Sequence, residues 1–222
     1  MTARAPRRLP AVLFDMDGTL LDSIALIIEG AVHAFDGRKG PRPTREEWKA
    51  LIGTPLDAML APWAVDAEDA AFLKARYRKF QVDNHDGFVS LYDGVEETLR
   101  ELHARGHPMG IVSSKLDSGI RRSMDFYKLT PLFDVIVGID HTARHKPDPE
   151  PVRFALAKLG VGTHEAIFVG DSPHDIEAGR AAGVVTVAVP WGAYTRAEIE
   201  PAGPTHWIER MAELPALLAG RG

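Results

Sequence analysis

Five short apolar segments stand out along the chain, and each is followed by residues with a helical spacing of apolar positions. The segments cover approximately residues 11–15, 109–112, 134–138, 166–170 and 184–189. They show no alternation of polar and apolar residues, which is typical of strands that are covered on both faces. Between them, apolar residues recur every three or four positions, as on the buried face of a helix. This alternation predicts an α/β fold with a doubly wound, Rossmann-like parallel sheet.

The region between the first two strands has a different pattern, because helical spacing continues with no convincing strand between Leu21 and about Ser90. Ser23 is a residue type that caps helices, and we expect its side chain to cap a helix that runs to about Phe35. A longer helical stretch covers about residues 66–82. The whole block is therefore predicted to be helical.

A chain of 222 residues is long enough for one such sheet together with a small accessory domain. We predict an α/β core formed by residues 1–21 and 90–222, and an inserted helical cap formed by residues 22–89. Residues 1–10 have the composition of a loose tail before the first strand.

Composition and charge narrow the range of partners. The net charge is −5, so no broad basic face for nucleic acid or an anionic membrane is expected. The chain has no cysteine, which excludes disulfides, thiolate catalysis and cysteine-based zinc sites. The apolar segment near the N-terminus is too short for a signal peptide or a membrane span. We expect a cytoplasmic protein that is a monomer or a weak homodimer.

Polar residues that can carry chemistry stand at the ends of the predicted strands. Asp15 and Asp17 end the first strand, Ser113 the second and Asp171 the fourth, while Lys146 lies in the loop after the third. Ligands of open parallel sheets bind beyond the carboxyl ends of the strands, so we expect these residues to share one crevice. Each has a simpler explanation as a turn residue, a helix-start residue or a solvated lysine. Three carboxylates around one pocket, however, repel one another unless a cation or proton compensates them.

The segment Asp15-Met16-Asp17-Gly18-Thr19 indicates a particular chemistry. Gly18 allows the chain to fold back, so that the Asp15 carboxylate and the backbone carbonyl of Asp17 point toward one spot. Hard oxygen ligands of this kind are suited to Mg²⁺. A carboxylate beside such an ion can attack phosphorus. An ordinary Asp-Gly turn is the alternative, but it needs only part of this set.

These residues resemble the four motifs of the haloacid dehalogenase-like hydrolase superfamily. The motif residues are, in order, Asp15-Met16-Asp17-Gly18-Thr19, Ser113, Lys146 and Gly170-Asp171-Ser172-Pro173-His174-Asp175. The helical block falls where subfamily I of that superfamily places its cap. The chain looks most like the phosphoglycolate phosphatase and bacterial pyrophosphatase branch. That narrower likeness is carried by Asn84-His85-Asp86 and by residues 111–115 and 146–151.

The resemblance implies Mg²⁺-dependent hydrolysis of a small phosphorylated metabolite, either a phosphoglycolate-like phosphomonoester or pyrophosphate, through an aspartyl-phosphate. It implies that Asp15 is the nucleophile, ionised at its ordinary pKa of about 3.9. Asp17 is expected to act as the general acid and base, and Ser113 and Lys146 to stabilise the phosphoryl group. Mg²⁺ is expected to be held by Asp15, the Asp17 carbonyl and Asp171.

Further residues are expected to bind the phosphate or to support the site. The phosphate-binding residues implied by the resemblance are Gly18, Thr19, Ser113, Ser114, Lys146 and, from the cap, Thr54. Ser172, His174 and Asp175 are expected in supporting roles, with Asp175 orienting Lys146 or a metal-bound water rather than binding the ion directly. For Thr54, a simple helix stop is an equally good interpretation. For His174, the alternative is an ordinary histidine at a helix start.

Two other functions fit part of this pattern. A phosphohexomutase of the β-phosphoglucomutase type resembles this chain in its cap and in both aspartates. A receiver-like signalling module also combines aspartate, lysine and a hydroxyl with Mg²⁺ on a doubly wound sheet. A signalling switch needs neither a leaving-group acid such as Asp17 nor a helical lid. Asp17 also counts against dehalogenases and phosphonatases, which lack an acid at that position.

Overall fold

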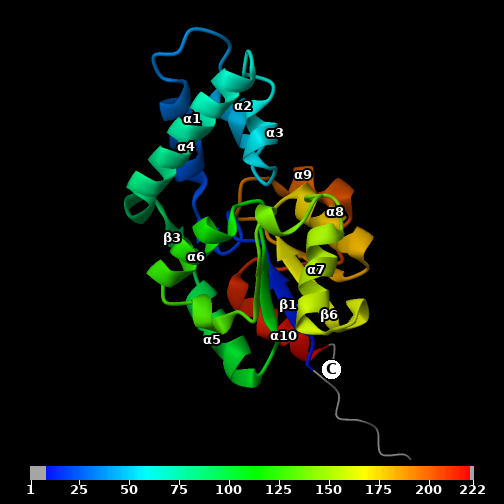
Figure 1. The fold of residues 1–222 in the computed structure, drawn as a ribbon. Coiled ribbons are helices and arrows are strands. Elements are labelled where there is room, and N and C mark those ends of the chain that lie inside the picture. The colour runs from blue at the N-terminus through cyan, green and yellow to red at the C-terminus, as the bar shows by residue number, and fades with distance from the viewer. Residues whose placement is uncertain (1–8, 221–222) are drawn as a thin grey trace, which may run out of the picture.

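A six-stranded parallel sheet forms the centre of the computed structural model, which describes residues 9–220 (Figure 1). Most of the predicted tail over residues 1–10 lies outside the described residues. The strand order is β5-β4-β1-β6-β7-β8, with all neighbours parallel. The strands are β1 (Ala11–Phe14), β4 (Met109–Val112), β5 (Val135–Val137), β6 (Ala166–Gly170), β7 (Val185–Ala188) and β8 (His206–Trp207).

The predicted doubly wound sheet is confirmed, and all five predicted strands are present. The sixth strand, β8, was not predicted, because it has only two residues and is defined by its pairing with β7. A strand this short carries no apolar periodicity of its own.

Helices cover both faces of the sheet. Alternate residues of β1 point to opposite faces. Val12 and Phe14 therefore pack in one apolar cluster, and Ala11 and Leu13 in another. The first cluster includes residues of α5 (Val95–Arg105), α6 (Asp117–Phe126) and α10 (Leu214–Ala219). The second includes residues of α7 (Glu150–Leu159) and α8 (Pro173–Ala182).

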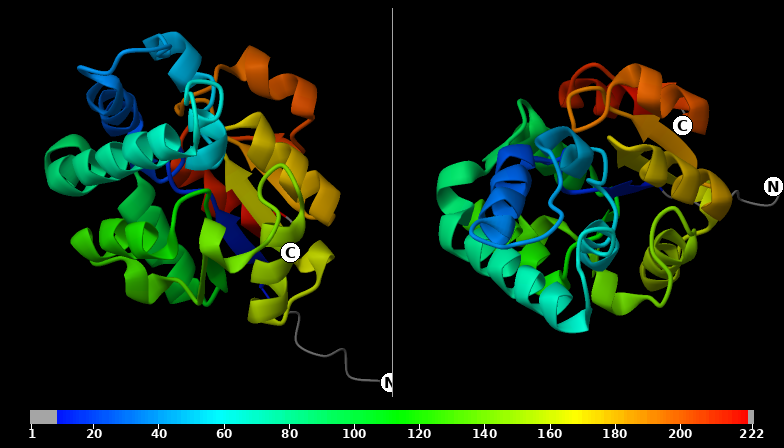
Figure 2. Two further views of the ribbon diagram at one scale, coloured as in Figure 1. Left: turned by 45° about the horizontal axis from the view of Figure 1, so that its top comes forward. Right: turned by 90° about the horizontal axis from the view of Figure 1, so that it is seen from above.

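A helical cap lies above the carboxyl ends of the strands (Figure 1). It consists of α1 (Ile24–Phe35), α2 (Arg45–Lys49), α3 (Leu56–Leu60) and α4 (Ala67–Phe88). Helices α1 and α4 lie side by side over the core (Figure 2). Helix α4 begins close to the predicted start, after its capping residue Asp66, but ends six residues later than predicted. None of the helices within residues 9–220 has the length and apolar character to cross a membrane.

Two short strands mark the passage between core and cap. β2 (Leu21–Asp22) and β3 (Ser90–Leu91) pair in an antiparallel manner. The expectation of no strand between Leu21 and Ser90 is therefore wrong at the two ends of this block. Each strand has only two residues, and their pairing depends on contacts between distant parts of the chain.

The cap is docked against the core in this structure. One apolar cluster joins cap residues such as Trp48 and Leu73 to core residues Ile176 and Ile199, the latter in α9 (Arg196–Ile199). The hydroxyl of Tyr194 donates hydrogen bonds to the cap carbonyls of Ala50 and Ile52, at 2.8 and 2.9 Å. Polar and apolar contacts together hold the cap over the strand ends.

Candidate active site

The turn after β1 is built around Gly18. The carbonyl of Met16 accepts from the amides of Leu20 and Leu21, both at 2.9 Å, and this closes the turn. Gly18 has a φ of +87°, and a Cβ placed there would lie only 2.3 Å from an oxygen of Asp171. Only glycine can therefore combine this backbone conformation with such a close approach to the neighbouring strand end.

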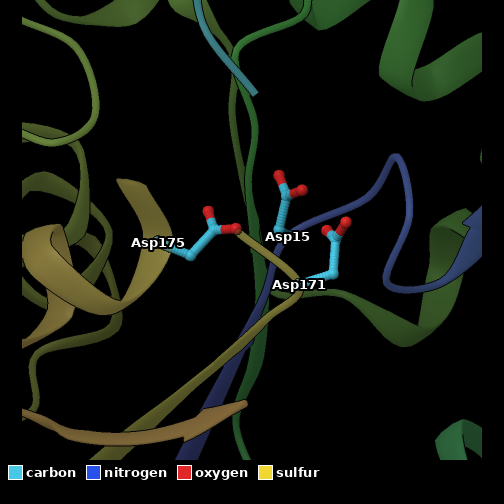
Figure 3. A group of neighbouring side chains, drawn as sticks. All are labelled: Asp15, Asp171 and Asp175. Carbon is cyan, nitrogen blue, oxygen red and sulfur yellow. The ribbon is translucent and has the colours of Figure 1, made fainter. Parts of the chain in front are cut away.

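Three buried carboxylates meet beside this turn. Asp15 follows β1, Asp171 follows β6, and Asp175 lies in the first turn of α8. Each offers one oxygen, and these atoms all lie within 4.8 Å of one another. Figure 3 shows the three side chains turned toward one another. Segments more than 150 residues apart in sequence are thus brought together, as the strand-end rule predicts.

Lys146 lies between two of these acids. Its Nζ donates to Asp15 at 2.7 Å and to Asp175 at 2.6 Å. The side chain is buried, and burial alone favours the neutral amine. The attraction of Asp15 and Asp175 outweighs burial and holds the pKa of Lys146 above its usual value. Lys146 therefore stays a cation in contact with Asp15.

Asp175 is fixed by the start of α8. Its second oxygen accepts from the Ser172 amide at 3.1 Å and from the Ser172 hydroxyl at 2.6 Å. The hydroxyl of Ser172 also accepts from the Asp175 amide, which completes a capping box. Both oxygens of Asp175 therefore have protein donors, and this geometry supports the expectation that Asp175 orients Lys146.

Asp171 accepts hydrogen bonds on both of its oxygens. Thr19 donates from its hydroxyl at 3.0 Å, and Ala193 from its amide at 2.9 Å. Burial, followed by repulsion from Asp175, nevertheless raises the pKa of Asp171 to about 7. This carboxylate is oriented by its donors but carries a charge that the protein compensates poorly.

Asp15 departs from the expectation of an ordinary pKa. Burial, which attraction to Lys146 offsets only in part, and repulsion from Asp175 and Asp171 raise the pKa of Asp15 well above its usual value. A strand-end aspartate looks ordinary in sequence, and only the packing reveals its burial. Positive charge beyond that of Lys146 would therefore favour the ionised form of Asp15.

The donor set fits a divalent cation. Three carboxylates face a single lysine, which leaves an excess of negative charge in a buried space. All the available donors are oxygens, and hard oxygen ligands suit Mg²⁺. The expected ligands Asp15 and Asp171 belong to this group, whereas the carboxylate of Asp17 does not. For Asp17 the expected ligand is the backbone carbonyl.

The Asp17 side chain has its own partners. Its Oδ1 accepts from the Ser23 hydroxyl at 2.5 Å and from the Lys115 ammonium at 2.7 Å. Ser23 occupies the predicted position at the start of α1, but its side chain does not cap that helix. The capping expectation is thus wrong: the side chain is turned to donate its proton to the Asp17 carboxylate, and its oxygen accepts from no amide of the helix. Lys115 was not assigned a role from the sequence, although it follows Ser113 at a strand end.

The two serines after β4 have different surroundings. Ser113 is buried, lines the cavity described below and accepts a hydrogen bond from the amide of Lys115 at 3.3 Å. Ser114 donates its hydroxyl to the cap carbonyl of Gly53 at 2.6 Å. The proton of Ser114 is therefore committed to a contact between core and cap, whereas the Ser113 hydroxyl donates to none of the described residues.

The cap loop at residues 53–54 approaches the start of α8. A Cβ at Gly53, where φ is +96°, would lie 3.3 Å from Ser172 and 3.8 Å from His174. Thr54 lines the cavity, but its hydroxyl donates to the carbonyl of Leu51 at 2.7 Å, as in a helix stop. Among the described residues, Nδ1 of His174 is buried without a hydrogen-bond partner, and burial lowers the pKa of this side chain.

Residues 191–193 were missed in the sequence analysis. The amide of Ala193 contacts Asp171, and the indole of Trp191 donates to the Thr19 carbonyl at 3.2 Å. A Cβ at Gly192 would lie 2.1 Å from Asp171. This loop follows β7, so the strand-end rule gives the signal that could have found it.

A cavity of about 500 Å³ separates the turn after β1 from the cap. Asp15, Asp17 and Ser113 line it from the core. Cap residues that line it include Ile27, Met59, Tyr77 and Arg78. A space of this size between two domains suits a small metabolite.

The sequence and the fold both have known counterparts. The profile of the family described as haloacid dehalogenase-like hydrolase matches residues 12–189. The chain is 38% identical over 211 residues to the pyrophosphatase PpaX of Bacillus velezensis, covering 94% of this chain and 95% of that protein. It is 37% identical over 207 residues to the pyrophosphatase PpaX of Bacillus pumilus, covering 93% and 95% of the two chains.

A solved structure with the same fold is that of a predicted phosphoglycolate phosphatase from Haemophilus somnus. The TM-score is 0.86 at 23% sequence identity, and the match covers 95% of this chain and 98% of that one. The agreement extends over cap and core together.

Proposed function

The chain belongs to the haloacid dehalogenase-like hydrolase family, and we propose that it is a Mg²⁺-dependent phosphatase that works through an aspartyl-phosphate on Asp15. The observation that carries this proposal is the meeting of Asp15, Lys146 and Asp171 at one edge of the sheet, beside the cavity. Four separate strand ends contribute to that edge when Ser113 is included.

In the first step, a carboxylate oxygen of Asp15 forms a bond to phosphorus while the bond to the leaving oxygen breaks. Lys146 keeps its charge beside Asp15 and reduces the repulsion between the carboxylate and the phosphate. Ser113 offers a hydroxyl to a phosphate oxygen from the same side of the cavity. The Mg²⁺ expected on Asp15, the Asp17 carbonyl and Asp171 supplies further charge neutralisation when bound.

Asp17 is the proposed general acid and base. It lines the cavity, where Lys115 and Ser23 hold its carboxyl in place. Protonated Asp17 gives its proton to the leaving oxygen. It then takes a proton from the water that attacks phosphorus, which releases phosphate and restores the Asp15 carboxylate. Proton transfer of this kind contributes roughly 10²–10⁴-fold to the rate.

The proposed substrate is a small phosphomonoester of the phosphoglycolate type or pyrophosphate. Its support comes from relatives named pyrophosphatases at 36–38% identity over nearly the whole chain. The cavity of about 500 Å³ is compatible with either molecule. Neither the mutase nor the receiver alternative has comparable support, and a receiver does not account for the match over residues 12–189.

A panel of phosphorylated metabolites tests this function. We expect Mg²⁺-dependent release of phosphate from at least one small member, with p-nitrophenyl phosphate as a general reporter. Asp15→Asn serves as the blank, because it keeps the size of the side chain and removes the nucleophilic oxygen. Phosphate release by this variant at the wild-type rate, or full turnover in a chelator, would contradict the proposal.

A further inference from the structure

We propose that Arg78 of the cap selects substrates whose leaving group carries its own negative charge, and that the Tyr77 hydroxyl assists it. This inference rests on the proposed phosphatase function. It assigns the two sides of the cavity different tasks: the core holds the transferred phosphoryl group, and α4 holds the group that leaves.

One face of α4 is directed at the cavity. Lys74, Tyr77, Arg78 and Gln81 all line it, and their spacing of three and four residues places them on the same side of the helix. Asp15, Asp17 and Ser113 line the same cavity from the core. A molecule with its phosphoryl group at Asp15 therefore has its other end between the core and this face of α4.

The cations of α4 differ in their partners. Lys74 forms an ion pair with Asp57 at 2.6 Å, and Lys79 pairs with Asp83 at 2.7 Å. Arg76 donates to the carbonyls of Asp36 and His33. Arg78 has no hydrogen bond or ion pair with the described residues, although it lines the cavity.

Two lysines among the described residues also line the cavity, and both are engaged: Lys74 by Asp57 at 2.6 Å and Lys115 by Asp17 at 2.7 Å. The guanidinium of Arg78 is therefore the charge on this wall that is left for a ligand. A planar guanidinium binds carboxylate or phosphate through two parallel hydrogen bonds.

Tyr77 provides a second, independent observation. Its side chain is 8% exposed and lines the cavity, yet its hydroxyl has no hydrogen bond with the described residues. Burial, and then the negative charge of Asp17, raise the pKa of Tyr77, so the hydroxyl keeps its proton. A hydroxyl without a protein partner at a cavity wall is available to donate to a ligand acceptor.

The chemical class follows from these two groups. A hydroxyl donor on Tyr77 and a free guanidinium on the next residue of the helix favour a small leaving group that ends in an anion. Glycolate ends in a carboxylate, and the leaving group of pyrophosphate is itself a phosphate. Leaving groups without charge, such as ethylene glycol, offer nothing to Arg78.

The experiment compares phosphoglycolate with 2-hydroxyethyl phosphate, its uncharged counterpart, and includes pyrophosphate and p-nitrophenyl phosphate. Arg78→Ala removes the charge from a surface helix position where alanine is well tolerated. Lys79→Ala is the matched control, since it removes one positive charge from the next residue, which does not line the cavity. Arg78→Lys tests for partial rescue, and Tyr77→Phe removes only the hydroxyl.

We expect wild-type kcat/KM to be higher for a substrate with a charged leaving group than for 2-hydroxyethyl phosphate. Arg78→Ala should lower kcat/KM for that charged substrate by about 10- to 100-fold, the value of one charge-assisted interaction. The loss should fall mainly on KM, because Arg78 holds a part of the substrate remote from the reacting bond. For 2-hydroxyethyl phosphate and p-nitrophenyl phosphate the change should stay within about twofold.

The inference is overturned if Arg78→Ala changes all substrates equally, or if Lys79→Ala has the same effect. It also fails if the wild type does not distinguish charged from uncharged leaving groups. Failure of the proposed function has a separate signature, namely no phosphate release from any substrate, or release that is unaffected by Asp15→Asn.

Discussion

The core and cap sides of the cavity are built in opposite ways. On the core side, Asp15, Lys146, Asp175 and Asp171 are tied to one another or to neighbouring amides and hydroxyls by short hydrogen bonds. On the cap side, Arg78 faces the cavity with no hydrogen bond to a described residue, and so does the Tyr77 hydroxyl.

From this difference between the two sides we infer that the core side carries out phosphoryl transfer and the cap side selects the substrate. Phosphoryl transfer requires charges held in fixed positions before the substrate arrives, because reorganising them during the reaction costs activation free energy. Recognition of a leaving group instead requires groups that have no better partner than the substrate. Changes on the core side should therefore affect every substrate, whereas changes on the cap side should affect some.

The largest effect is expected from Asp15→Asn. Turnover should fall by about 10⁴-fold or more for every substrate, because the attacking oxygen is lost. The fold should be retained, since the side chain keeps its size and one buried charge is removed. Steady-state kinetics and thermal unfolding measure the two effects. Loss of activity toward only one substrate would contradict the assignment of Asp15 to the shared chemistry.

Lys146→Met should affect both activity and stability. It leaves Asp15 and Asp175 buried without their cation, which costs about 3–5 kcal/mol of the free energy of unfolding. Turnover should fall for all substrates. Denaturant unfolding measures the stability of Lys146→Met and of a control variant, Lys158→Met, which changes an exposed lysine of α7. Equal stability of the two variants would argue against a compensating role for Lys146.

Metal removal should make stability depend on pH. Folded Asp171, with a pKa of about 7, keeps a proton that the unfolded chain, at 3.8, has lost. The folded state then binds more protons, so stability falls as pH rises from about 4 to 7, by at most about 1.4 kcal/mol per pH unit for this group.

Thermal unfolding in EDTA and in Mg²⁺, with wild type and Asp171→Asn, tests this dependence. Wild type in EDTA should lose more stability with rising pH than Asp171→Asn does, and Mg²⁺ should reduce the difference. Identical pH profiles for the two proteins in EDTA would contradict the buried, poorly compensated charge.

A smaller effect is expected where the cap contacts the core. Gly53→Ala introduces strain at a φ of +96° and a contact 3.3 Å from Ser172, so docking of the cap should weaken. We expect kcat/KM to fall about tenfold, the equivalent of roughly 1.4 kcal/mol, with the unfolding of the core nearly unchanged. Gly37→Ala, with a φ of +69° and open space around the new Cβ, is the matched control.

The smallest effect on activity is expected at the far end of α4. His85 is buried and contacts the Ser123 hydroxyl of α6 at 2.8 Å. Ser123→Ala should cost about 1–3 kcal/mol of stability, because one ring nitrogen loses its partner. Activity should change little, since neither residue lines the cavity. Denaturant unfolding measures the loss of stability. An unchanged midpoint would show that the hydrogen bond between His85 and Ser123 does not stabilise the protein.

Local patterns in the sequence were sufficient to predict the architecture of the fold. Apolar segments without polar alternation correspond to strands covered on both faces, and the strand-end rule placed Asp15, Ser113, Lys146 and Asp171 at one edge of the sheet. The rule succeeds because the direction of a parallel strand determines the edge at which its last residue lies. This inference does not require knowing which distant segments of the chain contact one another.

Only the tertiary structure decided the partners of each side chain. The contact of Ala193 with Asp171, the pairing of β8 with β7 and the position of Arg78 at the cavity wall all depend on how separate elements pack. The burial that raises the pKa of Asp15 depends on this packing too. Periodicity records which face of an element is apolar, but distances between side chains are set by how the elements pack.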